Sequence, residues 1–107
     1  MLLRLCYMGI EIQKVPEGTH VNVSGELQFY DSQKFMQVVP EEAKGSGRNV
    51  TIDMRELKFI DSSGLGAILY VSEALRMQGQ KLRIVNANEH CRKLLDKIAP
   101  VGTFSLE

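Results

Sequence analysis

The chain has 107 residues, of which 44% are hydrophobic and 24% are charged, as is typical of one ordinary globular domain. Its 13 Lys and Arg residues balance its 13 Asp and Glu residues, and no basic run occurs, so binding to nucleic acid is not expected. No apolar run is long enough to span a bilayer, so membrane insertion is not expected either.

The first residues read as an extension rather than as a signal peptide. Residues 1–7 are apolar, but they are short and lack a small-residue cleavage site. We therefore interpret 1–7 as an N-terminal extension and 8–107 as the domain. Cys6 and Cys91 have no Cys-x-x-Cys spacing and are interpreted as buried, reduced thiols of a cytoplasmic protein. His20 and His90 have no neighbouring ligand set, so neither a metal site nor a cofactor is expected.

The chain opens with a predicted β-hairpin. Residues 9–15 alternate loosely between apolar and polar side chains, and Pro16-Glu17-Gly18 gives a turn signal. Residues 19–24 alternate cleanly, with Val21 and Val23 on one face. A helix follows, with Asp31 or Ser32 as its N-cap, and Pro40 either kinks this helix or starts a second short turn.

The second half alternates strands with helices. Residues 49–54 predict a central strand, and 61–78 have the most regular helical pattern in the chain. Residues 81–85 predict another strand, a helix capped by Asn88 ends at Pro100, and 103–106 can form a last short strand. The order predicts a single layered α/β domain, with a mixed sheet of about four to five strands and three to four helices on one or both faces.

The most informative motif lies where a buried strand meets the predicted helix at 61–78. Its residues are Phe59-Ile60-Asp61-Ser62-Ser63-Gly64-Leu65-Gly66-Ala67. The first turn of a helix has free N–H groups and a partial positive charge, so it tolerates an anion such as a phosphate. Two interpretations remain open: a serine that only caps the helix, and a serine that is phosphorylated or contacts a partner.

Other uses of this turn are disfavoured by the sequence. A hydrolase elbow requires Gly-x-Ser-x-Gly, a P-loop requires Gly-Lys-Ser/Thr, and neither pattern is present. Neither histidine has an evident acidic partner that would complete a catalytic triad, so no catalytic residue is assigned. Direct binding of a nucleotide or small anion at the helix N-terminus is a weaker alternative.

Several segments together resemble the anti-sigma-factor antagonists, the bacterial regulatory form of the STAS domain. The segments that carry the resemblance are Val23-Ser24-Gly25-Glu26-Leu27, Val50-Thr51-Ile52-Asp53, the motif from Phe59 to Gly66, Lys81-Leu82-Arg83-Ile84-Val85-Asn86 and Arg92-Lys93-Leu94-Leu95. The resemblance implies a STAS-like fold and a regulatory domain without enzymatic activity. It covers nearly everything from Met8 onward.

The resemblance also implies a switch. An anti-sigma factor that is a serine protein kinase, with its own ATP and magnesium, phosphorylates Ser62, and a serine phosphatase reverses the modification. The unphosphorylated form binds the kinase and is released when Ser62 is phosphorylated. The implied partner-binding residues are Asp61, Ser62, Ser63, Gly64, Leu65, Gly66, Glu26 and Gln28.

One departure from the family bears on the choice of partner. Many relatives have Asp after Gly-Glu-Leu, whereas this chain has Gln28, followed by Phe29 and Tyr30. A carboxylate near the partner surface is thus replaced by an amide. A target other than a sigma factor is consistent with this change. The alternative function is an unphosphorylated STAS accessory module in a larger complex, such as a transporter or a stress-signalling assembly. The sequence leaves the oligomeric state open.

Overall fold

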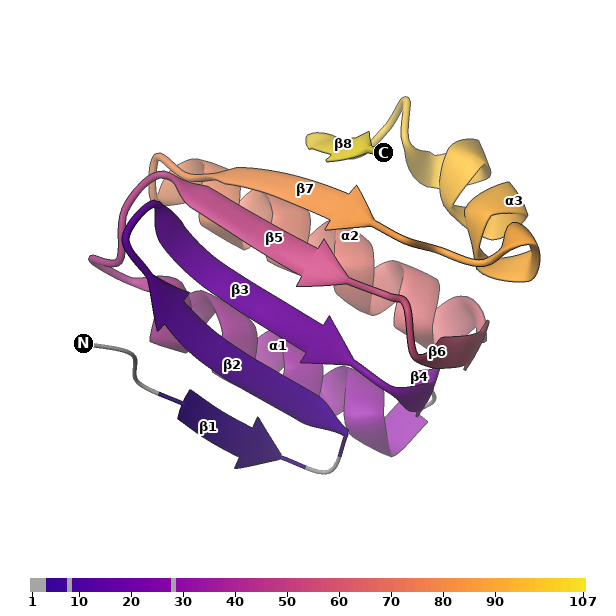
Figure 1. The fold of residues 1–107 in the computed structure, drawn as a ribbon. Coiled ribbons are helices and arrows are strands. Elements are labelled where there is room, and N and C mark those ends of the chain that lie inside the picture. The colour runs from indigo at the N-terminus through magenta and orange to yellow at the C-terminus, as the bar shows by residue number, and fades with distance from the viewer. Residues whose placement is uncertain (1–3, 8, 28) are drawn as a thin grey trace.

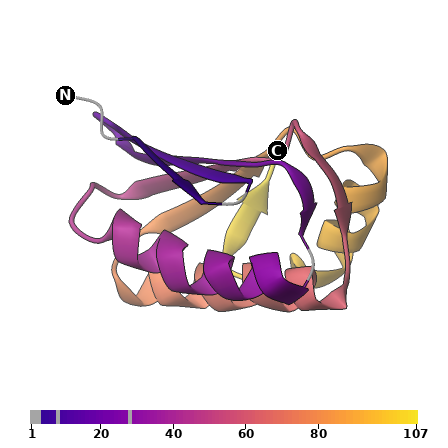
Figure 2. The same cartoon turned by 90° about the horizontal axis from the view of Figure 1, so that it is seen from below.

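The computed structural model describes residues 4–7, 9–27 and 29–107 and shows a β-sheet with helices packed against one of its faces (Figure 1, Figure 2). The strands are β1 (Arg4–Tyr7), β2 (Ile10–Val15), β3 (Gly18–Val23), β4 (Gly25–Leu27), β5 (Asn49–Asp53), β6 (Leu57–Ile60), β7 (Lys81–Val85) and β8 (Phe104–Leu106). The helices are α1 (Phe29–Ala43), α2 (Ser62–Met77) and α3 (Glu89–Ile98).

The main sheet has the strand order β1-β2-β3-β5-β7-β8. β1, β2 and β3 are antiparallel neighbours, whereas β3, β5, β7 and β8 pair in parallel. The predicted mixed α/β fold is confirmed, and so is its opening hairpin, in which Val15 pairs with Gly18 across the turn. Residues 4–7, expected within an extension, add β1 at the edge, so this sheet has six strands.

A small parallel pair, β4 and β6, lies at one end of the main sheet (Figure 1). This pair was not predicted from the sequence. β4 has only three residues, and β6 has buried residues only at its two ends, so neither shows the alternation that marks a half-buried strand. β6 leads directly into α2, and the pair therefore positions the turn that contains Ser62.

The hydrophobic core lies between the sheet and the pair α1 and α2, which run side by side beneath one sheet face (Figure 2). Buried and more exposed residues alternate along β5 and β7, because only one face of the sheet is covered by these helices. From α2 the buried residues are Gly64, Ala67, Ile68, Val71, Ser72 and Leu75. These residues form the face of α2 that packs on the sheet.

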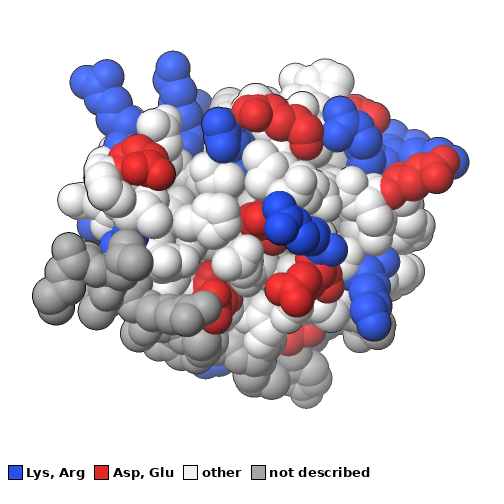
Figure 3. All heavy atoms as spheres, in the orientation of Figure 1, with Lys and Arg blue, Asp and Glu red and all other residues white. Residues whose placement is uncertain are grey.

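The opposite sheet face carries charges of both signs, interspersed among uncharged side chains (Figure 3). On β5 and β7 this face includes Thr51, Asp53 and Arg83, which are only partly buried or exposed. A large field of one sign is not visible on this side, which agrees with the balanced composition. Among the described helices, none combines the length with the apolar character that a membrane crossing requires.

The helix boundaries resolve two open points. α1 begins at Phe29, before the predicted start at Asp31, and it continues through Pro40 to Ala43 rather than restarting there. Pro40 lies within the helix, and its carbonyl oxygen accepts a hydrogen bond from Gln78 Nε2 at 3.3 Å. α3 is capped by Asn88, as predicted, and ends at Ile98, two residues before Pro100.

Candidate functional site

The start of α2 is fixed by Asp61, which occupies the N-cap position. Its backbone is extended, with φ −99° and ψ −175°, and its Oδ1 accepts a hydrogen bond from the Gly64 N–H at 2.9 Å. The Asp61 carbonyl oxygen accepts the first helical bond, from the Leu65 N–H at 3.0 Å. This is the local geometry that an aspartate favours at a helix N-terminus. The predicted helix start is therefore confirmed, and Asp61 rather than a serine is the cap.

Ser62 and Ser63 are the first two residues of α2. Ser62 is exposed and Ser63 is partly buried. Since Asp61 supplies the cap, the Ser62 hydroxyl group is not needed for that purpose, and within the described chain it forms no hydrogen bond. An exposed hydroxyl group at the positive end of a helix can accept a phosphate without unpacking the core.

The next three residues divide between the core and the surface. Gly64 is buried and Leu65 packs against the core as a partly buried side chain. Gly66 is exposed, and a Cβ atom built on it meets no atom within 4 Å. Leu65 therefore contributes mainly to packing, whereas Gly66 leaves open space on the outer side of α2.

The β4–β6 pair brings the Gly-Glu-Leu segment to this turn. The Cα partners in the pair include Glu26 with Phe59 and Leu27 with Ile60, and Ile60 lies two residues before Ser62. The backbone of Glu26 is thus adjacent to the strand that leads into the turn. Gln28 and the side chain of Glu26 lie outside the described part of the chain.

Two exposed aromatic rings beside this turn were not predicted from the sequence. Phe59 and His90 stack with their centroids 5.4 Å apart and an interplanar angle of 12°. Asn88 positions His90, because its Oδ1 accepts the Cys91 N–H at 2.8 Å and its Nδ2 donates to the Leu57 carbonyl at 3.1 Å. Phe59 and His90 are 31 residues apart, so no local pattern pairs them.

The described geometry gives Ser62 no catalytic partner. His90 stacks on Phe59, and the His20 Nε2 atom lies 3.7 Å from Asp53 Oδ2. Cys91 is a buried free thiol, as expected, and burial raises the pKa of this thiol, which disfavours its thiolate. The side chain of Cys6 lies outside the described part of the chain.

A polar cluster on the open sheet face secures the end of β5. Asp53 Oδ1 accepts hydrogen bonds from the Arg55 N–H at 3.0 Å and from Asn86 Nδ2 at 3.1 Å. Burial raises the pKa of the Asp53 carboxyl group, but these hydrogen bonds and the nearby Arg55 and His20 outweigh it, so the pKa lies below its ordinary value of 3.8. This cluster stabilises the chain reversal between β5 and β6.

The chain is similar to known proteins in both its sequence and its fold. The family model of the STAS domain matches residues 9–101. The anti-sigma F factor antagonist of Paenibacillus polymyxa is 30% identical over 87 residues, which cover 76% of this chain and 74% of the relative. The anti-sigma-B factor antagonist of Bacillus subtilis is 22% identical over 89 residues, which cover 83% of this chain and 81% of that protein.

The fold also matches a solved structure over its whole length. The anti-sigma factor antagonist SpoIIAA in its unphosphorylated form superimposes with a TM-score of 0.67 and 17% identity, covering 100% of this chain and 88% of that one. At this level of identity the match shows the fold alone. The six-stranded sheet and its helices therefore follow a known architecture.

We expect Asp61→Ala to destabilise the protein by about 0.5–2 kcal/mol, because the Gly64 N–H loses its acceptor. Urea denaturation would measure the free energy of unfolding. Ser62→Ala is the matched control and should leave this free energy within about 0.5 kcal/mol of the wild type, because Ser62 is exposed. Equal effects of the two substitutions would contradict the assignment of Asp61 as the cap.

We expect the contribution of Asp53 to stability to depend on pH. The folded-state pKa lies below the ordinary value of 3.8, so the ionised group is stabilising above that value and this contribution is lost as the pH falls through the folded-state pKa. Urea denaturation of the wild type and of Asp53→Asn between about pH 7 and pH 2 would test this. The difference between their unfolding free energies should shrink at the acid end, and a constant difference would refute the assignment.

Proposed function

The chain belongs to the STAS domain family, and on that premise we propose that it is a non-enzymatic protein-interaction switch controlled by phosphorylation of Ser62. The proposed partner is an anti-sigma factor that is also a serine protein kinase. It binds the unphosphorylated form, phosphorylates Ser62 and is then released, and a serine phosphatase restores the binding form. The relatives from Paenibacillus polymyxa and Bacillus subtilis, both named as anti-sigma factor antagonists, support this class of partner.

The observation that carries the proposal is the position of Ser62. It is exposed at the first residue of α2, directly after the aspartate that caps the helix. A phosphoryl group there adds close to two negative charges at physiological pH. The positive end of the helix tolerates this charge, and the buried face of α2 lies on the other side. Phosphorylation therefore changes the docking surface rather than the fold.

The proposed docking surface comprises the exposed part of the turn and its neighbours. Ser62, Ser63 and Gly66 present the accessible atoms, Asp61 and Gly64 hold their geometry, and Leu65 anchors the turn to the core. Glu26 of β4 and, from the sequence alone, Gln28 are proposed as further contacts. A partner that covers this surface removes it from water, and a phosphoryl group on Ser62 would then be desolvated at high cost.

We expect the protein isolated from its own host to carry one phosphoryl group on Ser62. Intact mass and peptide mapping would detect it, and a Ser62→Ala variant should lack it. Ser62→Ala should retain the partner in pull-down experiments, whereas Ser62→Asp should bind it at least about tenfold more weakly through the added charge.

Equal binding of the partner by Ser62→Ala and Ser62→Asp would refute the switch. An unmodified Ser62 in several growth conditions, together with a stable complex that survives purification, would instead favour the alternative of a fixed accessory module. The same two measurements therefore separate the two functions.

We expect substitutions of Gly66 to separate binding from folding. Since a Cβ atom at this position meets no other atom within 4 Å, Gly66→Ala should fold normally and gain up to about 1 kcal/mol of stability from its better helix propensity. Gly66→Leu should also fold but should weaken partner binding at least about tenfold, because its side chain occupies the space that a partner needs. Circular dichroism and titration calorimetry would measure both properties. Normal partner binding by a folded Gly66→Leu variant would contradict the proposed surface.

A further inference from the structure

An uncharged groove runs between α1 and α2 on the side of the helices that faces away from the sheet. Its first part, a hollow of about 270 Å³, adjoins the turn that contains Ser62. A second hollow shares Gln33 and Met36 with it and extends the groove along the helices. The residues that line this α1–α2 groove are Ser32, Gln33, Met36 and Gln37 from α1, and Ser63, Gly66, Ala67 and Tyr70 from α2.

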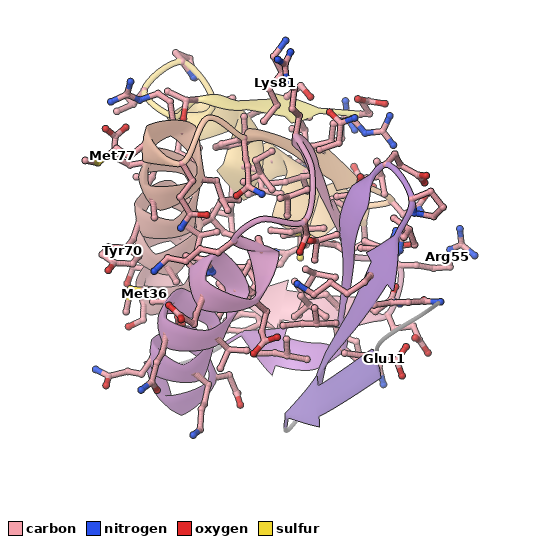
Figure 4. All side chains as sticks on the ribbon, turned by 90° about the vertical axis from the view of Figure 1, so that its left-hand side faces the viewer. Glu11, Met36, Arg55, Tyr70, Met77 and Lys81 are labelled. Atoms are coloured by element: carbon pink, nitrogen blue, oxygen red, sulfur yellow. The ribbon has the colours of Figure 1, made fainter. Side chains whose placement is uncertain are left out.

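The lining of the groove is unusual for a helix surface in contact with water. None of these described lining residues is charged, although charged side chains normally dominate the outer face of an amphipathic helix. Tyr70 has 56% of its surface exposed, and Met36 is only partly buried. Figure 4 shows Met36 and Tyr70 on the same side of the helix pair, away from the sheet. They form an apolar surface that no described segment of the chain covers.

Ser32 adds unused hydrogen-bonding capacity to the groove. Its side chain is 2% exposed, and its Oγ atom has no hydrogen-bond partner in the described part of the chain. A buried hydroxyl group without a partner costs about 1–3 kcal/mol. Rotation about its Cα–Cβ bond can turn this hydroxyl group toward a polar group that enters the groove.

We propose that the α1–α2 groove binds an amphipathic helix of the same partner protein that contacts the unphosphorylated turn. This inference rests on the proposed function and specifies how the partner is recognised. The groove begins at Ser63, the residue after the proposed phosphorylation site, so one partner can contact the turn and the groove together. The absence of charge in the lining selects a helix whose contacting face is apolar and uncharged.

The chemistry of the groove suits a helix that packs along it. Gly66 allows the backbone of the occupant to approach α2 closely, since no side chain fills the space above it. Met36 is a flexible, polarizable wall and Tyr70 a rigid aromatic one, and side chains of these types favour apolar anchors at i, i+4 and i+7 of a bound helix. A phosphoryl group on Ser62 would lie at the end of this apolar contact. It would have to lose its hydration as the helix docks, which explains how the modification releases the partner.

Photocrosslinking in the native host tests this inference. Tyr70→p-benzoylphenylalanine places a crosslinking group in the groove, and the same replacement of Met77 is the matched control. Met77 lies on the same helix and is 77% exposed, but it lines neither hollow.

Each replacement is introduced into the full chain together with Ser62→Ala or Ser62→Asp. We expect the Tyr70 position to crosslink one protein, at a helical peptide, in the Ser62→Ala background. The yield should fall at least tenfold in the Ser62→Asp background, and the Met77 position should give little product.

The crosslinked protein is then purified, and its affinity is measured by titration calorimetry. Tyr70→Glu should weaken binding at least tenfold, whereas Met77→Glu should leave the affinity unchanged. Circular dichroism confirms that both variants are folded.

The outcomes distinguish this inference from the proposed function. If Ser62→Ala retains a partner that Ser62→Asp loses, but the Tyr70 position does not crosslink it, the groove is not its binding site and the switch stands. Equal crosslinking from Tyr70 in both backgrounds, from Met77 as strongly as from Tyr70, or to a second copy of this chain also overturns the inference. If Ser62→Ala retains no partner at all, the proposed function fails and the inference fails with it.

Discussion

The hydrogen bond from the Gly64 N–H to the Asp61 carboxylate determines where α2 begins, and the site depends on that choice. The cap satisfies a free N–H group of the first turn, so the chain is helical from Ser62 onward. With Asp61 as the cap, Gly64 and Ile68 face the sheet, while Ser62 and Gly66 face outward. The cap thus orders the turn in which Ser62 is exposed, while the buried residues of α2 hold the helix against the sheet.

The amphipathic character of α2 then separates stability from recognition. The residues that hold the helix against the sheet, such as Val71 and Leu75, have no exposed surface. The residues on the outer side contribute little to the core, since Gly66 meets no neighbour and Tyr70 is more than half exposed. A charge added at Ser62 is therefore felt by whatever docks on the outer side rather than by the core. A modification at this position can therefore change binding while the fold stays intact.

Most of the fold could be predicted from the sequence because its elements have clear local signals. Alternation in β3, the helical period of α2 and the N-caps Asp61 and Asn88 each determine structure within a few residues. β4 and β6 could not be predicted, because they are short and their pairing joins residues far apart in the sequence, such as Leu27 and Ile60, which are 33 positions apart. The passage of α1 through Pro40 was undecidable for a similar reason. Proline disfavours a helix interior locally, and here the packing of α1 against α2 and the sheet prevails.

In the candidate site too, some features follow from neighbouring residues in the sequence, whereas others arise only when distant segments pack together. Asp61 and Ser62 are adjacent in the sequence. The chemistry of a helix N-terminus marks this turn as a candidate site, and the resemblance to the anti-sigma-factor antagonists singles out Ser62 within it. The uncharged α1–α2 groove has no such signature, because it exists only where Met36 of one helix meets Gly66 and Tyr70 of another. In the sequence each of these residues looks like an ordinary member of its helix. The proposed modification site can therefore be read from a short motif, whereas the groove that we propose for the partner is a property of the packed pair of helices.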